Sequence, residues 1–300
     1  MNNEVKKVLF IVNKYAGTGY QPELEGRILD ACEQQEAECT IEFTQSRGHA
    51  TELAREAEAK GFSRVIAVGG DGTVNEVAQG LLHSPVQMGI IPRGSGNGLA
   101  RHLGIPIKMT HALTSLFTSE VITMDTFTVN GALSLNVSGI GFDGHVANLF
   151  GKDKKRGLGG YVKITISEFI RFKELEAILT IDGKKYDRHA FIIAIANSSQ
   201  YGNNARIAPS ASVCDQLLNI TLLEKVPPYR MDFVYDFFTG KINNSRYCET
   251  FEGKNISIQL KEPIAFHVDG EPSGLSDFFD IKINVASLNM LAPPSAGLRL

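Results

Sequence analysis

Apolar residues over the first 120 positions fall into two alternating patterns. Short, largely apolar runs at 8–12, 64–68 and 88–92 are typical of strands buried on both faces, and 39–44 alternates as a strand does. Between these runs, apolar residues recur at helical spacing, most clearly at Val74, Val77, Ala78, Leu81 and Leu82. This order predicts a doubly wound α/β domain, with a mostly parallel sheet and helices on both faces.

The pattern changes near residue 121. Strand-like runs then follow one another, at 121–129, 132–137, 176–181, 184–197, 217–223, 255–260, 264–268 and 279–285. Helical stretches interrupt them near 160–172 and 229–239, and Asp182-Gly183 is typical of a two-residue hairpin turn. We therefore predict an antiparallel β-sandwich domain at 124–287. The first domain covers 1–123, and a C-terminal tail of about 288–300 returns to it.

Composition narrows the classes of protein. The 300 residues are 43% hydrophobic and 21% charged, which fits a globular chain with full cores. The 30 Lys and Arg against 33 Asp and Glu give a net charge of −3, so the basic excess of a nucleic-acid binder is missing. We find no signal-peptide pattern, no apolar run of roughly 18 residues and no CxxC pair among the 4 cysteines. We expect a cytoplasmic protein with reduced thiols.

The strongest chemical signal is a glycine-rich turn at 68–76, VGGDGTVNE, where a buried strand meets a helix. Glycines let a ligand approach the backbone, and the free amides of a helix start favour an anion. Asp71 sits among those amides, which suggests a bridging Mg²⁺ or a proton to be moved. The alternative is that Asp71 only caps the helix and the glycines only make a tight turn.

A second glycine turn, PRGSGNGLA at 92–100, also joins a strand to a helix. Turns after neighbouring parallel strands face one crevice, where open α/β sheets bind ligands. A third motif, Asp269-Gly270-Glu271, ends a strand of the second domain, and an ordinary hairpin turn explains it equally well. The match to G-x-G-x-x-G at 139–144 lacks a βαβ context, so we interpret it as a packing turn.

Taken in order, these motifs resemble those of the lipid kinase family that contains bacterial diacylglycerol kinases and the sphingosine and ceramide kinases. Residues 69–76 are similar to the family's GGDGT-x-NE signature, and residues 92–100 are similar to its PxGSGNALA element. Other family motifs resemble segments of this chain, namely NKYAG at 13–17, GIGFD at 139–143, the YG…AP…DQL stretch over 201–217 and DGE at 269–271. The resemblance covers nearly the full length. It implies a first domain like those of phosphofructokinases and NAD kinases.

The resemblance also implies an activity, which is the transfer of a phosphoryl group from ATP to a lipid hydroxyl with Mg²⁺. The ATP-binding residues would be Asn13, Thr44, Gly69, Gly70, Asp71, Gly72, Thr73, Glu76, Gly94, Ser95, Gly96 and Asn97. The catalytic residues would be Asp71, Asp125, Asp269 and Glu271, with Asp71, Asp269 and Glu271 converging in a cleft between the domains. The family pattern favours Glu271 or Asp269 as the base. A structural Mg²⁺ would be held by Asp215 and the backbone oxygens of Ser212 and Leu217.

Some positions depart from the family pattern. Gly98 stands where diacylglycerol kinases have Asp, as in sphingosine-kinase-like members, and Gln216 replaces a glycine of the metal loop. The lipid therefore stays open between diacylglycerol-like and sphingosine-like substrates. A phosphotransferase acting on a soluble substrate such as NAD, or a nucleotide-binding protein without catalysis, remains an alternative.

Two segments are candidates for peripheral contact with a membrane. A basic run at 152–156 precedes the apolar stretch 160–172, and Phe233, Val234, Phe237 and Phe238 form another apolar cluster. Basic and apolar residues together dock on anionic lipid surfaces, although a solvated loop and core-facing helices explain the same pattern. The oligomeric state stays open, with a homodimer as one candidate.

Overall fold

The computed structural model describes residues 7–17, 22–151 and 167–294. The chain forms two compact units. Unit 1 runs to Asp125 and resumes at Val285, and unit 2 is Thr126–Asn284. The chain passes from one unit to the other within β5 (Glu120–Val129) and again within β14 (Glu271–Ala292).

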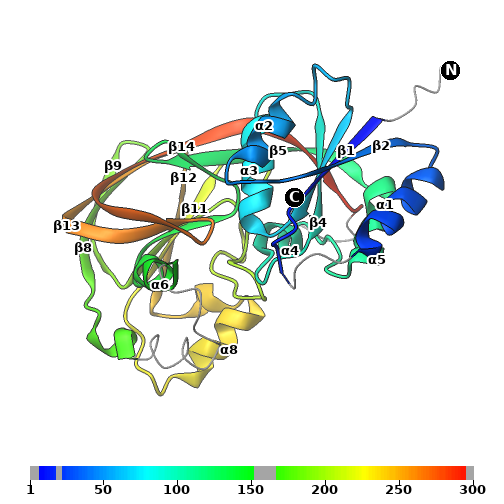
Figure 1. Ribbon diagram of the computed structural model, residues 1–300. Coiled ribbons are helices and arrows are strands. Elements are labelled where there is room, and N and C mark those ends of the chain that lie inside the picture. The colour runs from blue at the N-terminus through cyan, green and yellow to red at the C-terminus, as the bar shows by residue number, and fades with distance from the viewer. Residues whose placement is uncertain (1–6, 18–21, 152–166, 295–300) are drawn as a thin grey trace. The chain divides into compact units, whose positions relative to one another are not determined.

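Unit 1 is an α/β domain with a parallel sheet (Figure 1). Its strands are β1 (Lys7–Val12), β2 (Glu38–Phe43), β3 (Arg64–Gly69) and β4 (Gln87–Pro92), in the order β2-β1-β3-β4. The end of β14 adds a parallel neighbour to β4 at Met290 and Met88. All six residues of β3 are buried, which explains its continuous apolar run.

In the described part of unit 1, the helices that accompany this sheet are α1 (Glu23–Glu33), α2 (His49–Arg55), α3 (Asp71–Leu81), α4 (Gly98–His102) and α5 (Met109–Thr118). Helix α2 packs on α3, and α1 packs on α5. Gly80 permits the contact between α2 and α3, because a Cβ there would lie 2.6 Å from the Ala54 Cβ. The predicted doubly wound α/β fold is confirmed.

Unit 2 is an antiparallel β-sandwich. One layer contains β12 (Cys248–Gly253), β11 (Leu218–Leu223), β10 (Ile192–Ala196) and β7 (Val137–Gly141). The other contains β9 (Lys184–Ala190), β8 (Leu175–Ile181) and β14, with β5 and β6 (Ala132–Ser134) at its edge. The long strand β13 (Asn255–Val268) pairs with β8 near its start and with β7 near its end.

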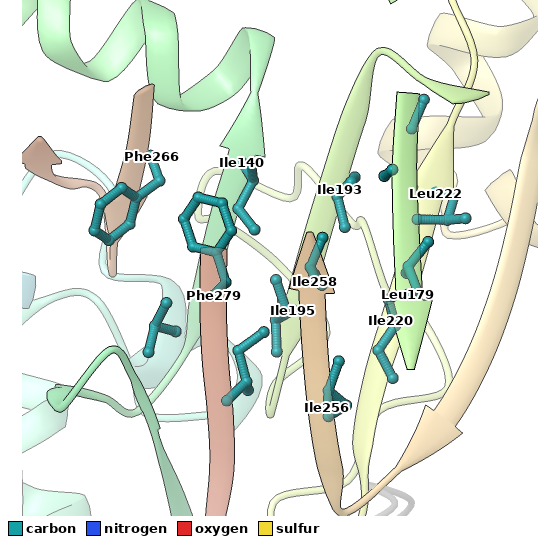
Figure 2. Close-up of a cluster of buried hydrophobic side chains, with 14 of the residues drawn as sticks. Ile140, Leu179, Ile193, Ile195, Ile220, Leu222, Ile256, Ile258, Phe266 and Phe279 are labelled. Atoms are coloured by element: carbon teal, nitrogen blue, oxygen red, sulfur yellow. The ribbon is translucent and has the colours of Figure 1, made fainter. Parts of the chain in front are cut away.

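The sandwich core consists of aliphatic and aromatic side chains from both layers (Figure 2). Leu179 of β8 and Ile258 of β13 belong to one layer, and Ile195 and Ile220 to the other. Strand β8 buries alternate residues, as a sheet with one solvated face requires. The predicted β-sandwich is confirmed.

The structure corrects several predicted elements of unit 2. The run 132–137, predicted as one strand, divides between β6 and β7. The runs 255–260 and 264–268 are one strand, with a register shift between Gln259 and Ile264. Helix α6 (Phe142–Gly151) and strand β12 were not predicted. Helix α6 begins within the G-x-G-x-x-G match, where glycine and aspartate indicated a turn. Most of the predicted helical stretch 160–172 lies outside the described residues.

Candidate active site

Three loops of unit 1 meet where β1, β3 and β4 end. Gly70 and Gly94 touch through their backbones, because a Cβ on Gly94 would lie 2.7 Å from the Gly70 Cα. Asn13 Nδ2 donates to Thr73 Oγ1 at 3.0 Å, which ties the loop after β1 to α3. Thr44 follows β2 at the same edge, since its amide donates to the Val12 carbonyl at 2.9 Å.

Asp71 joins the two glycine turns. Its Oδ2 accepts the amide of Asn97 and its Oδ1 accepts the amide of Gly98, each at 3.0 Å. Asp71 is the first residue of α3, yet its carboxylate caps the start of α4, 26 residues further along the chain. Asp71 therefore holds the second turn against the first, which is a more specific structural role than capping its own helix.

The amides of the first glycine turn remain suited to an anion. The residue before α3 is Gly70, which has no side chain to cap the helix. The first bond of the helix runs from the Val74 amide to the Gly70 carbonyl at 3.0 Å, so Gly72 and Thr73 precede it. These amides and the missing Cβ atoms form the kind of cradle that phosphate groups use.

The second glycine turn uses many of its polar groups internally. Asn97 has a left-handed backbone, with φ of 50°, and its side chain pairs with the amide and carbonyl of Gly94 at 2.8 and 2.7 Å. Arg101 Nε donates to the Gly96 carbonyl at 3.1 Å. Ser95 stays exposed. Within this loop Gly94, Gly96 and Asn97 build the shape, and Ser95 offers its hydroxyl to solvent.

Two further predicted residues of unit 1 make hydrogen bonds that involve backbone atoms. Glu76 lies on α3, where its carbonyl accepts the Thr51 hydroxyl at 2.8 Å and its side chain is partly exposed. Asp125 is only 2% exposed, and its Oδ1 accepts the amide of Ala286 at 2.7 Å. Asp125 thus fixes the backbone of β14 where the chain re-enters unit 1.

In unit 2, Asp269 and Gly270 form the two-residue loop between β13 and β14. Their φ angles are 49° and 84°, as a tight hairpin turn requires. The Asp269 carboxylate accepts the Ser134 hydroxyl at 2.6 Å and the amides of Leu135 and Asn136 at 2.9 and 3.0 Å. The motif is therefore a hairpin turn, and its carboxylate ties that turn to the segment entering β7.

Glu271 differs from both aspartates. It is the first residue of β14, and its side chain is exposed. Within the described residues its carboxylate takes part in no hydrogen bond or ion pair, whereas its carbonyl accepts the Ser273 hydroxyl. Glu271 therefore has both carboxylate oxygens available to a ligand or a proton.

The candidate metal loop lies before β11. Asp215 Oδ1 accepts the Leu217 amide at 3.0 Å, and Ser212 Oγ accepts the Cys214 amide at 3.3 Å. Gln216 has a φ of 64°, so it keeps the left-handed backbone that a glycine would adopt easily. Carboxylate and carbonyl oxygens are the donors that Mg²⁺ prefers. The donor set fits such an ion, although no cluster of three acidic, His or Cys side chains occurs among the described residues.

Sequence reasoning missed His267 and gave Asp143 no role beyond its place in a motif. The two side chains lie 3.3 Å apart, and His267 is hydrogen-bonded to the Asp269-Gly270 turn. The one available signal was a histidine two positions before Asp269, near the end of a predicted strand.

Helix α8 (Met231–Thr239) carries apolar residues on two sides. Phe233 and Phe237 pack against a buried cluster of unit 2, whereas Val234 and Phe238 are exposed, so the predicted apolar cluster is divided. The basic run 152–156 lies outside the described residues. No helix in the described part of the chain is long and apolar enough to cross a membrane.

Two family models cover most of the chain. Residues 7–129 match the diacylglycerol kinase catalytic domain, and residues 136–286 match the YegS C-terminal NAD kinase beta sandwich-like domain. A Pseudomonas aeruginosa protein named "Probable lipid kinase YegS-like" is 32% identical over 243 residues, covering 78% of each chain. The diacylglycerol kinase of Bacillus subtilis is 26% identical over 277 residues, covering 90% of this chain and 91% of its own.

Solved structures show the same architecture. A crystal structure from Bacillus anthracis matches with a TM-score of 0.80 at 25% identity, over 98% of this chain and 99% of the other. Another, of a diacylglycerol kinase from the same organism, has a TM-score of 0.76 at 24% identity. An α/β catalytic domain joined to a β-sandwich thus defines the class. The chain belongs to the family of diacylglycerol kinases and YegS-like lipid kinases.

Proposed function

We propose that this protein is an ATP-dependent lipid kinase that transfers the γ-phosphoryl group of ATP to the hydroxyl of a diacylglycerol-like or sphingosine-like lipid. The observation that carries the proposal is the pair of glycine turns whose backbones touch at Gly70 and Gly94 and which Asp71 fastens together. Family membership supports it independently, since the relatives are named as kinases.

In this proposal the backbone of unit 1 binds the phosphates. The amides at the start of α3 supply positive dipoles, and Asn13 and Thr73 border them through their own hydrogen bond. Thr44 and Ser95 stand at the ends of the neighbouring strands, where the nucleotide would lie. Mg²⁺ bound with ATP would neutralise charge on the phosphates, and carboxylates near them are its natural ligands.

The three candidate carboxylates have different roles. Glu271 is the proposed base, because its oxygens are unengaged and it can accept the proton of the lipid hydroxyl. Asp269 already accepts at least three hydrogen bonds, and Asp71 at least two. Their proposed work is to hold the hairpin and the phosphate-binding loops, and Asp125 holds the backbone of β14.

A second metal function is proposed for the loop before β11. Asp215, with the carbonyl oxygens of Ser212 and Leu217, would hold a structural Mg²⁺ in unit 2. Gln216 keeps the backbone conformation of the loop, which supports this assignment despite the missing glycine.

We further propose that helix α8 brings the enzyme to its lipid. Met231, Val234, Tyr235 and Phe238 recur at positions i, i+3, i+4 and i+7 and are exposed, Met231 by 67% and Tyr235 by 63%. Such a stripe opposite a core-facing side suits shallow insertion at a bilayer surface. The enzyme would thus act in the cytoplasm and visit the membrane transiently.

The decisive experiment is a phosphorylation panel with Mg²⁺ and labelled ATP. Diacylglycerol, monoacylglycerol, sphingosine, ceramide, phosphatidylglycerol and NAD serve as acceptors. We expect one lipid to be labelled and Glu271→Gln to lose about 10²–10⁴-fold in rate, as loss of a general base does. Glu262→Gln, which removes the same charge from an exposed position of β13, should keep full activity.

The alternatives give distinct results in the same panel. Labelling of NAD alone would replace the proposal by a phosphotransferase acting on a soluble substrate. ATP binding with no labelled acceptor and no ATP turnover would leave a nucleotide-binding protein.

A further inference from the structure

A buried polar network of unit 2 ends at the hairpin that carries Glu271. Tyr201 OH donates to Asp143 Oδ2 at 2.7 Å, and His267 Nε2 lies 3.3 Å from the same oxygen. The Gly270 amide donates to His267 Nδ1 at 3.1 Å. The His267 side chain is only 4% exposed and that of Asp143 is 14% exposed. The proposed reaction as described above gives these side chains no role.

The contacts fix where the protons are. Because His267 Nδ1 accepts the Gly270 amide, this nitrogen carries no hydrogen, and Nε2–H donates to Asp143. Burial, followed by the nearby charge and hydrogen bond of Asp143, raises the pKa of Tyr201 well above its ordinary value. Tyr201 therefore stays protonated as a donor. Asp143 Oδ1 accepts the Gly144 amide at 2.8 Å, which completes the partners of Asp143 among the described residues.

The sequence makes room for this network. A Cβ on Gly139 would overlap the Asp143 carboxylate and would lie 2.6 Å from His267 Nε2. Glycine at this position of β7 is therefore needed for the Asp143–His267 contact, which explains the first glycine of the G-x-G-x-x-G match without any dinucleotide.

The network and Asp269 restrain the two residues of the turn separately. Asp269 is bonded to the segment 134–136, and Gly270 is bonded to His267. Glu271 follows directly, with an exposed side chain that has no restraint of its own among the described residues. The position of its carboxylate thus depends on the backbone of the turn.

We propose that Tyr201, Asp143 and His267 position Glu271 by holding the Gly270 amide. They are positioning residues, since none of them needs to touch the substrate. This inference rests on the proposed function, in which Glu271 is the base. It differs from a role in fold stability alone, because it ties the network to the rate of phosphoryl transfer rather than to nucleotide binding.

The first test does not depend on activity. Nitrogen-15 NMR of the labelled full-length protein reports which imidazole nitrogen of His267 carries the proton. We expect a hydrogen on Nε2 and none on Nδ1 at neutral pH. A hydrogen on Nδ1 would overturn the inference, because the Gly270 amide would then have no acceptor.

The second test separates the two ends of the imidazole. In His267→Asn the side-chain oxygen can occupy the place of Nδ1, and in His267→Gln the side-chain nitrogen can occupy the place of Nε2. His267→Gln keeps a donor to Asp143 but removes the acceptor of the Gly270 amide. We expect kcat with the labelled lipid to fall about tenfold in His267→Gln, with the KM for ATP unchanged, and to stay within about twofold in His267→Asn.

The outcomes distinguish the two proposals. If the unmodified protein phosphorylates no lipid, the proposed function fails. If it is active and His267→Gln keeps its kcat, or if both variants lose rate only in proportion to their loss of folded protein, the positioning role is wrong.

Discussion

Asp71→Asn should loosen the contact between the two glycine turns without unfolding the chain. The carboxylate accepts two amides at 3.0 Å, and a side-chain amide can accept only through its one oxygen. The NH2 group would face either the Asn97 or the Gly98 amide, donor against donor. A hydrogen bond to a charged group contributes about 1.5–3 kcal/mol, so we expect the free energy of opening this contact to fall by about 2 kcal/mol.

Hydrogen exchange measures this locally. A loss of about 2 kcal/mol corresponds to about thirtyfold faster exchange, at 1.36 kcal/mol per factor of ten. The change should be confined to the amides of Asn97 and Gly98, with the amides of β1 and β3 unaffected. Asp30→Asn removes the same charge from an exposed position of α1 and should leave all these rates unchanged.

Kinetics complete the prediction. If the two turns bind the phosphates together, Asp71→Asn should raise the KM for ATP as well as lower kcat. Lost activity with unchanged exchange of Asn97 and Gly98 would refute the reasoning, because Asp71 would then act on the ligand alone.

Three further predictions follow from packing, exposure and burial. Gly94→Ala places a Cβ 2.7 Å from the facing backbone and should lower the free energy of unfolding by about 1–3 kcal/mol. Gly26→Ala adds a Cβ in open space on a helix and should raise the free energy of unfolding by about 0.5–1 kcal/mol. Urea unfolding measures both changes. Phe238→Ser should weaken cosedimentation with phosphatidylglycerol vesicles about fivefold at unchanged stability, and equal cosedimentation would exclude this part of α8 from membrane contact. Burial first, then Cys39, raises the pKa of Cys32 to about 12, and burial raises that of Cys248 to about 11. Iodoacetamide at pH 8 should therefore label Cys32 last, and peptide mass mapping that finds it labelled first would contradict the burial.

The fold was largely predictable because the burial of a strand or helix determines the spacing of its apolar residues. Strand β3 is buried at all six positions and β8 at alternate ones, and each run showed the corresponding period. Helix α6 was missed for a physical reason. Gly141, the last residue of β7, and Gly144, in the first turn of α6, resemble loop signals, but their lack of side chains permits close packing, as for Gly144 against the backbone of Ala265.

The location of the candidate site was predictable from the sequence, whereas the hydrogen-bond partners of its individual residues were not. Glycine turns after neighbouring strands mark an edge of the sheet, yet Asp71 finds its partners 26 and 27 residues away. For Asp269, a hairpin turn and a catalytic role were alternatives. The structure shows the turn and also gives the carboxylate at least three hydrogen bonds. No single-sequence pattern reports which oxygens are already occupied.

The candidate carboxylates differ in how many hydrogen bonds their oxygens accept, and this difference ranks them as candidates for the base. A carboxylate oxygen that accepts a backbone amide has one lone pair fewer for a ligand or a proton. Asp71 and Asp269 each accept such amides, whereas the Glu271 carboxylate accepts none among the described residues. The amides at the start of α3 make the proposed ATP site compatible with a net charge of −3, since in that proposal dipoles of the backbone rather than an excess of basic side chains face the phosphates. Charge balance therefore argues against a nucleic-acid surface but carries no argument against a nucleotide site.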